Sequence, residues 1–206
     1  MGKRVYVWEP LLRVTHWLTF LSIVLLIVTG LYIGDPYGQF SMATMRFLHF
    51  VASYVFTMSF LLRIYLWFAG NEFERLDQFI PLSSERRKNL VDTMAFYLFL
   101  RKELPRCTGS TGIAGLTYFI LFIVLFITIL TGFALYSETH VGGLWTLLGG
   151  WLLAFWNTGT IRLIHHISMW IIIPFAILHV YISFHNDIIE KSGLVMSIFT
   201  GYKTEE

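Results

Sequence analysis

The sequence contains a single cysteine, Cys107, and few charged residues. One cysteine cannot form a disulfide within the chain, and it excludes Cys-rich zinc sites, iron–sulfur sites and the C-x-x-C-H attachment of covalent haem. Asp, Glu, Lys and Arg together make up 14% of the 206 residues, against about 25% in soluble domains. Because thiolate sites are excluded, any metal must be held by histidine or carboxylate. With so few charged residues, we expect no nucleic-acid partner.

Apolar residues are abundant instead, at 56% of the chain. A helix needs about 20 apolar residues to cross roughly 30 Å of hydrocarbon, and four runs are long enough. We therefore expect one domain over residues 1–206, an all-α membrane protein with a four-transmembrane-helix bundle. The first run is too long for a cleaved signal peptide, and Asp35-Pro36-Tyr37 follows it in place of a cleavage site. The four expected spans are residues 15–33, 46–68, 113–136 and 162–184.

Lys and Arg predict the orientation, because cytoplasmic segments carry an excess of them. With four spans, both termini and the 69–112 connection lie on one side. The opposite side carries only Arg46 and Arg162, so the termini and this connection are expected in the cytoplasm. The cytoplasmic residues, counting Arg63 at a span end, are Lys3, Arg4, Arg13, Arg63, Arg75, Arg86, Arg87, Lys88, Arg101, Lys102, Arg106, Lys191 and Lys203.

Two segments between the spans have their own patterns. Residues 83–102 begin with a serine cap followed by Glu85, then turn apolar with basic ends. This pattern predicts an amphipathic helix on the cytoplasmic leaflet. Residues 144–157 are aromatic and uncharged but too short and glycine-interrupted to span, which indicates an interfacial segment on the outer face.

Short motifs indicate an internal repeat of two helix pairs. Residues 46–49 (Arg-Phe-Leu-His) at the start of the second span match residues 162–165 (Arg-Leu-Ile-His) at the start of the fourth. Thr29-Gly30 in the first span likewise matches Thr131-Gly132 in the third. In this alignment Arg63 takes the position of His179, since each follows its matched histidine by 14 residues.

Four of the seven histidines can be paired by their depth in the spans. His49 and His165 are expected near the outer ends of the second and fourth spans, whereas His16 and His179 lie toward the cytoplasm. At about 100° per residue, 14 residues return a helix to within about 40° of the same face. His165 and His179 therefore share a face, and His166 does not. Two layers follow, His49 with His165 and His16 with His179.

Two imidazoles from different helices suit the axial positions of a haem iron, whose other four ligands are porphyrin nitrogens. Tetrahedral zinc would need four ligands at one depth. We therefore expect two haem b groups. Gly30 and Gly132 could admit the flat macrocycle, or serve helix packing alone. Arg63 could pair with a haem propionate, or extend its side chain to the cytoplasmic surface.

Six short motifs run in order along the chain. They are Arg13–Thr19, Arg46–Phe50, Arg63–Tyr65, Gly70-Asn71, Gly132–Glu138 and His179–Tyr181. Together they closely resemble the b-type cytochrome subunit of membrane-bound nickel–iron hydrogenases, over about residue 5 to Tyr202. One departure is the loop between the third and fourth spans, where little sequence matches, so hydrogenase contacts there are not implied.

The resemblance implies a dihaem protein of four or five helices in a bacterial or archaeal cytoplasmic membrane. Such a subunit anchors the iron–sulfur small subunit and the nickel–iron large subunit on the periplasmic side and gives their electrons to quinone. The family's axial ligands correspond to His16, His49, His165 and His179. The family pattern His-x3-Met-Trp also selects His165 over His166.

Other functions remain open. A similar cytochrome could serve a formate dehydrogenase or another periplasmic oxidoreductase, or act alone as a quinol-reactive cytochrome b. A histidine-bearing metal transporter is disfavoured, because the four expected spans contain no acidic residue that could line an ion pathway.

Overall fold

The structure is a computed structural model that describes residues 3–103, 105 and 111–205. Cys107 and Arg106 lie outside the described residues. The chain divides into two compact units, the first comprising Met1–Leu116 with Ser183–Glu206 and the second Thr117–Ile182. Each unit is described below by itself.

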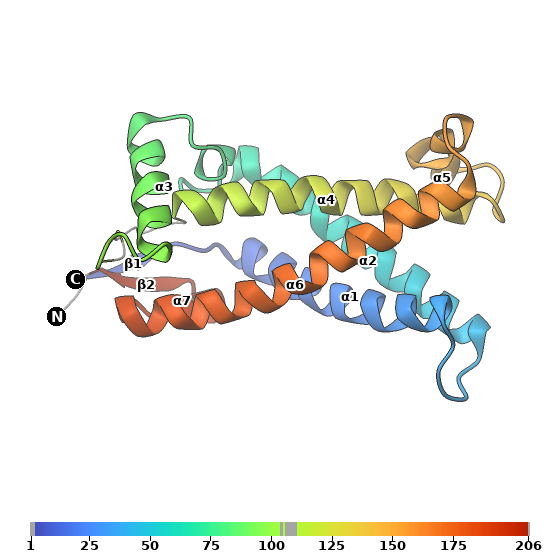
Figure 1. The fold of residues 1–206 in the computed structure, drawn as a ribbon, viewed down its shortest axis with the longest axis horizontal. Coiled ribbons are helices and arrows are strands. Elements are labelled where there is room, and N and C mark those ends of the chain that lie inside the picture. The colour runs from blue at the N-terminus through green and yellow to red at the C-terminus, as the bar shows by residue number, and fades with distance from the viewer. Residues whose placement is uncertain (1–2, 104, 106–110, 206) are drawn as a thin grey trace. The chain divides into compact units, whose positions relative to one another are not determined.

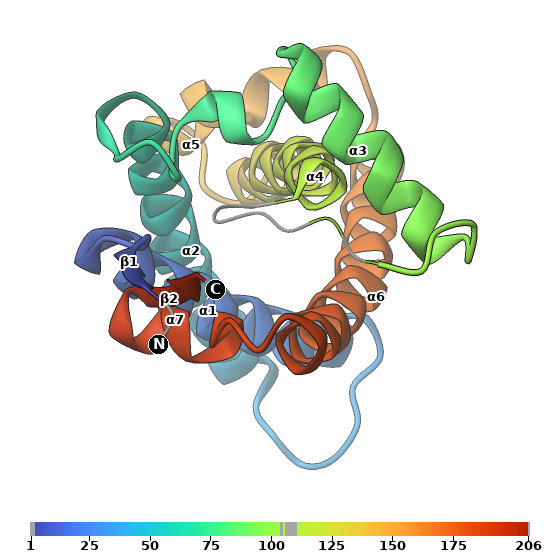
Figure 2. The same cartoon turned by 90° about the vertical axis from the view of Figure 1, so that its left-hand side faces the viewer.

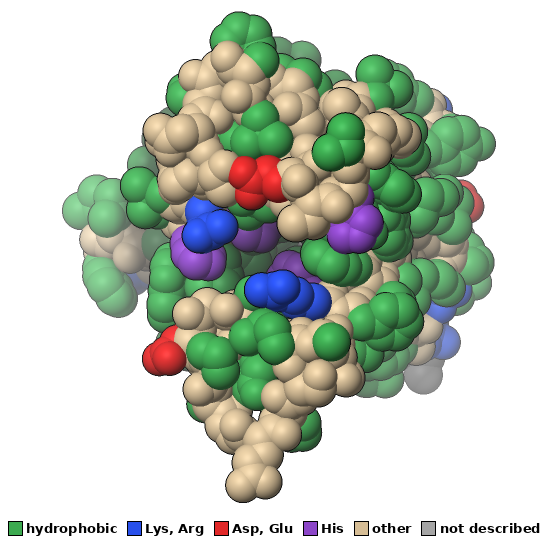
Figure 3. Space-filling view, turned by 90° about the vertical axis from the view of Figure 1, so that its right-hand side faces the viewer, with side chains coloured by type: hydrophobic (Ala, Val, Ile, Leu, Met, Phe, Trp, Pro, Cys, Tyr) green, Lys and Arg blue, Asp and Glu red, His purple; other side chains and the backbone are tan. Residues whose placement is uncertain are grey.

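Four long helices carry the expected spans, which confirms the four-span interpretation. They are α1 (Pro10–Gly34), α2 (Met42–Ala69), α4 (Gly112–Ser137) and α6 (Thr158–Glu190) (Figure 1). Each is long and apolar enough to cross a membrane. Large apolar side chains on them are exposed, as a lipid-facing surface requires. Figure 3 shows the face on which α5 (Leu144–Leu148) lies, rather than the flanks of the long helices, and charged side chains are few on it too.

The hairpin of α1 and α2 forms the core of the first unit (Figure 1). On α1 the buried Thr15, Ser22 and Thr29 recur every seven residues. A seven-residue spacing keeps one helix face toward a partner, and small residues let helices in a membrane approach closely. The buried Ala52 and Ser59 of α2 have the same spacing. This packing fixes the register between the two helices.

The ends of the chain meet in the first unit, which the sequence did not predict. Strand β1 (Lys3–Tyr6) pairs antiparallel with β2 (Tyr202–Glu205) (Figure 2). The short helix α7 (Leu194–Thr200) precedes β2, and the Trp8 indole Nε1 donates to Ser197 Oγ at 2.9 Å. Strands of four residues are too short for alternation of apolar and polar residues to be recognised in the sequence.

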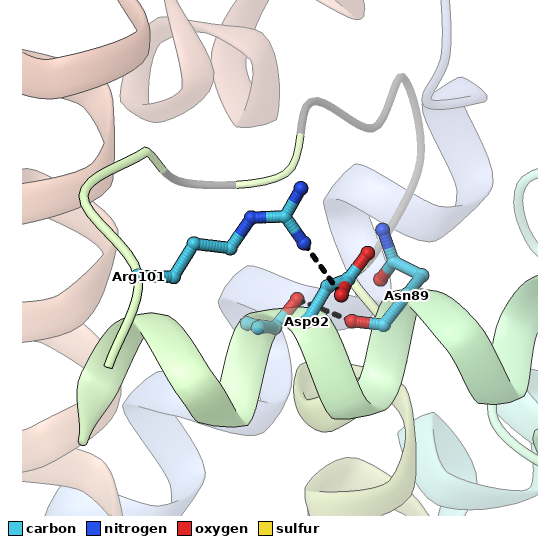
Figure 4. A network of polar contacts seen from close by, with 4 residues as sticks. Asn89, Asp92 and Arg101 are labelled. Atoms are coloured by element: carbon cyan, nitrogen blue, oxygen red, sulfur yellow. Dashed lines mark hydrogen bonds and ion pairs between the residues drawn. The ribbon is translucent and has the colours of Figure 1, made fainter. Parts of the chain in front are cut away.

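The connection after α2 contains a 3-10 turn, η1 (Leu76–Gln78), and a helix in the expected segment, α3 (Ser84–Tyr97). Ser83 caps α3 by accepting a hydrogen bond from the Arg86 N–H, as predicted. The helix ends earlier than the expected residue 102. The chain reverses at Phe99, whose φ is 60°, and Arg101 then pairs with Asp92 at 2.5 Å (Figure 4).

In the second unit, two short helices close one end of α4. They are α5 (Leu144–Leu148) and the 3-10 helix η2 (Gly150–Ala154), so residues 144–157 do not form a span, as expected. Leu152 of η2 packs with Ala134 of α4 and Ile161 of α6. A Cβ at Gly149 would overlap the Leu130 carbonyl oxygen, so this close approach requires glycine.

A buried carboxyl group holds the start of α1 in the first unit. Glu74 is fully buried, and its Oε1 accepts a hydrogen bond from the Glu9 N–H at 2.8 Å. Burial raises the pKa of Glu74, and the Glu9 carboxylate adds to this rise, while the Glu9 N–H and the positive charge of Arg63 oppose it. The folded chain therefore holds the Glu74 proton more tightly than the unfolded chain does.

Because this pKa is raised, the stability that Glu74 contributes is complete below its ordinary pKa of 4.5 and is lost as the pH rises through the folded-state value. Glu74→Gln keeps an oxygen acceptor for Glu9 and cannot ionise. We expect its thermal unfolding temperature in detergent to fall less than that of the parent chain between pH 5 and 8. Glu72→Gln, which removes the same charge at an exposed position, is the control. An equal effect of Glu72→Gln would assign the pH dependence to net charge.

Candidate haem-ligand site

In the first unit, His49 of α2 lies against the Thr29-Gly30 step of α1. Its Nδ1 is 2.9 Å from Thr29 Oγ1. The Thr29 hydroxyl donates its one proton to the Leu25 carbonyl oxygen, at 2.6 Å, so its oxygen accepts from His49. This network assigns the proton of the neutral imidazole to Nδ1, which leaves a lone pair on Nε2 for a metal.

The second unit repeats this geometry with His165 of α6 and the Thr131-Gly132 step of α4. His165 Nδ1 is 3.0 Å from Thr131 Oγ1, and that hydroxyl donates to the Ile127 carbonyl oxygen at 2.8 Å. The same donor and acceptor roles follow, so Nε2 of His165 is also the nitrogen with a lone pair. The sequence repeat is thus matched by a repeat of hydrogen bonds.

Gly30 and Gly132 make room for these two imidazole rings. A Cβ at Gly30 would lie 3.3 Å from His49 Cε1, and a Cβ at Gly132 would lie 3.3 Å from His165 Cε1. The ring of each histidine would then have to shift. The glycines therefore set the distance between histidine and neighbouring helix, a role that the sequence did not predict. Clearance for a macrocycle stays a prediction.

His179 of α6 has a different partner from the other two histidines. Its Nδ1 is 3.2 Å from the Tyr118 hydroxyl of α4, and its ring stacks on Phe175 at 5.9 Å between centroids. The sequence interpretation missed Tyr118. The repeat could have found it, because Tyr118 precedes Thr131 by 13 residues, just as His16 precedes Thr29.

His16 lies on α1 in the same unit as His49, with its ring edge-on to Trp17 at 5.6 Å between centroids. Each expected pair, His49 with His165 and His16 with His179, takes one histidine from each unit. The pairing therefore stays a prediction.

Arg63 contacts the connection that follows its own helix. Its Nη1 donates to the Glu74 carbonyl oxygen at 3.2 Å, and its guanidinium lies 4.9 Å from the centroid of the Phe79 ring. These contacts explain how a charged side chain can lie near the end of α2 without a cofactor to pair with it. A bond to a haem propionate stays a prediction.

His140 and His185 have local partners. His140 follows α4, is exposed, and stacks on Tyr136 at 4.1 Å between centroids. His185 Nδ1 lies 3.3 Å from Asn186 Oδ1. Neither shows the contact with a threonine–glycine step that His49 and His165 share.

The residues present fit a haem better than a bare metal ion. In the described part of the chain, no three His, Cys, Asp or Glu side chains gather as a metal-ion site would require. A haem iron needs only two axial ligands from the protein, and neutral imidazole is a common one. His49 and His165 offer Nε2 in that form, with Nδ1 held by a hydrogen bond as metal-ligating histidines are.

Four spans with oriented histidines define a class, the membrane-embedded b-type cytochromes. Residues 7–201 match the family described as prokaryotic cytochrome b561, and the chain belongs to this family. It is therefore a haem b electron-transfer protein that crosses the bacterial inner membrane several times.

Several curated relatives cover nearly the whole chain. A "Probable Ni/Fe-hydrogenase B-type cytochrome subunit" of Rhodobacter capsulatus is 36% identical, over 97% of this chain and 81% of the relative. Its namesake in Rhizobium leguminosarum bv. viciae is 32% identical, over 97% and 88%. The "Probable Ni/Fe-hydrogenase 1 B-type cytochrome subunit" of Escherichia coli (strain K12) is 33% identical, over 98% and 91%.

The glycine contacts predict a selective effect on haem binding. Gly30→Ala should displace the His49 ring and lower the haem content of the purified chain, measured as the pyridine haemochrome. Gly34→Ala is a matched control on the same helix, since a Cβ there meets nothing within 4 Å. Equal haem content in the two variants would show that the space beside His49 does not matter for the cofactor.

Proposed function

We propose that the chain is a dihaem cytochrome that anchors a periplasmic nickel–iron hydrogenase and passes its electrons across the membrane to quinone. His49 and His165 would hold one haem b, and His16 and His179 the other. The repeated threonine–histidine–glycine geometry carries this proposal. When bound, the haems supply one-electron carriers at two depths.

The protein prepares its ligands before any cofactor binds. Thr29 and Thr131 keep His49 and His165 in the tautomer that presents Nε2, and the adjacent glycines hold both rings close to the neighbouring helix. Tyr118 and Phe175 orient the ring of His179. Ligands whose rings are already fixed lose little conformational entropy on binding.

The assignment of a hydrogenase partner rests on relatives and motifs. Relatives from several bacteria carry hydrogenase cytochrome names and align over 96% or more of this chain. The proposed partners are an iron–sulfur small subunit and a nickel–iron large subunit. They would bind on the side opposite the termini, because the Lys and Arg distribution predicts cytoplasmic termini.

The quinone step requires protons as well as electrons. Reduction of a quinone to a quinol takes two electrons and two protons, so the acceptor would bind near the cytoplasmic layer of His16 and His179. Entry of electrons on the outside and uptake of protons on the inside would both add to the membrane potential.

The ligand assignment predicts which histidines are indispensable for each haem. The parent chain should bind two haems, and His165→Ala should lower the content to one, because it removes an axial ligand. His166→Ala is the neighbouring control and should keep both. The pyridine haemochrome measures haem content, and reduced-minus-oxidised spectra show whether the remaining haem is low-spin. A loss of haem from His166→Ala with none from His165→Ala would contradict the assignment.

The partner assignment has its own test. In membranes that contain the chain with its hydrogenase subunits, hydrogen should reduce quinone, and His16→Ala should abolish this activity while hydrogen still reduces an artificial dye. Formate-driven quinone reduction through the chain, with no response to hydrogen, would favour the formate dehydrogenase alternative.

A further inference from the structure

The hydrogen bonds to His49 and His165 do more than choose a tautomer. Thr29 and Thr131 are 1% and 4% exposed, so water does not compete for their oxygens. Each hydroxyl gives its proton to a carbonyl oxygen of its own helix. A hydroxyl that donates to its own helix acts toward the histidine as an acceptor, and this gives both bonds the direction N–H···O.

A fixed N–H···O bond changes the electronic character of a ligand. When the acceptor draws the Nδ1 proton partly away, the imidazole ring gains electron density, and Nε2 becomes a stronger electron-pair donor to the metal. A stronger donor stabilises ferric iron more than ferrous iron, because the ferric ion carries the greater charge. The reduction potential of the iron is therefore lowered.

We propose that Thr29 and Thr131 are positioning residues that lower the reduction potential of one haem through His49 and His165. This inference rests on the proposed dihaem function. It gives a physical cause for the reduction potential of the His49/His165 haem and assigns that cause to one threonine in each helix pair.

Tyr118 provides a contrast at His179. A phenol oxygen shares its lone pairs with the ring and accepts a hydrogen bond less readily than an aliphatic hydroxyl oxygen does. The Nδ1···O distance is 3.2 Å at Tyr118, against 2.9 Å at Thr29 and 3.0 Å at Thr131. The imidazole of His179 therefore gains less electron density, and we expect the His16/His179 haem to have the higher reduction potential of the two. With both haems bound, electron transfer from the His49/His165 haem to the His16/His179 haem would then be favourable.

The decisive variants are Thr131→Val and Thr29→Val, which replace the hydroxyl by a methyl group of similar size. Potentiometric titration of the visible spectrum should resolve two waves in the parent chain. Each variant should raise the midpoint potential of the lower wave. The expected change is about tenfold in the one-electron equilibrium constant, which corresponds to about 59 mV. Ferric electron paramagnetic resonance should show a changed low-spin signal for that haem alone.

Matched controls separate the hydrogen bond from packing. Thr128→Val removes a hydroxyl from the same helix that bonds the Val124 carbonyl oxygen, and it should leave both waves in place. Thr131→Ser restores the hydroxyl and should restore the parent potential. Tyr118→Phe should raise the other wave, by less than the threonine variants raise theirs.

The possible outcomes are distinct. Two haems with unchanged potentials in both valine variants would overturn the inference and leave the proposed function intact. Shifts of different waves by Thr29→Val and Thr131→Val would also overturn it, because the two histidines would then lie on different irons. A shift that Thr131→Ser does not reverse would assign the effect to packing and overturn it as well. Fewer than two haems in the parent chain would instead contradict the proposed function. If Thr131→Val loses its haem, Thr29→Val tests the same wave through the other ligand.

Discussion

The bond between a threonine hydroxyl and a histidine Nδ1 is the constraint on which the rest of the site depends. Inside a membrane span, an imidazole N–H has no water to bond, and leaving it unpaired is costly. A hydroxyl that already donates to its own helix offers an acceptor without creating a new unpaired donor. Thr29 and Thr131 meet this condition, and the glycine after each of them lets the ring come close enough. In each unit, the packing of the two helices keeps the threonine, the glycine and the histidine ring at the same level.

Much of this arrangement could be predicted because membrane helices have strong signals. The four spans follow from long apolar runs, and the serine cap of α3 follows from local hydrogen bonding that involves neighbouring residues only. The β1–β2 pairing joins residues at opposite ends of the chain, and strands of four residues carry no usable pattern. Phe99 ended α3 early with a positive φ, which nothing in its side chain indicates, since glycine and asparagine are the usual residues there.

The sequence indicated the candidate histidines, whose role as ligands stays a proposal, and missed the residues that support them. Histidines in a span are rare enough to be noticed, and helical phase separates His165 from His166. Threonine is common in membrane helices, so Thr29 and Thr131 were recognised only as repeat markers. Tyr118 resembled an ordinary aromatic residue near a span end. The roles of Thr29 and Thr131 depend on which side chain faces them across a helix pair, and the sequence does not show this. The repeat does place Tyr118 at the position of His16, and that signal was overlooked.

The internal repeat also shows how two related helix pairs differ at corresponding positions. Both pairs keep a threonine–glycine step on the first helix and a histidine on the second. They differ 13 residues before the threonine, where α1 has His16 and α4 has Tyr118, and 14 residues after the histidine, where α2 has Arg63 and α6 has His179. In the proposed ligand set α6 then carries two ligands and α4 carries none. The part of α4 is to orient, through Tyr118, Thr131 and Gly132, the two ligands of its partner helix. In that proposed set, a helix without a single ligand would orient one ligand of each haem and would thereby influence the reduction potential of both.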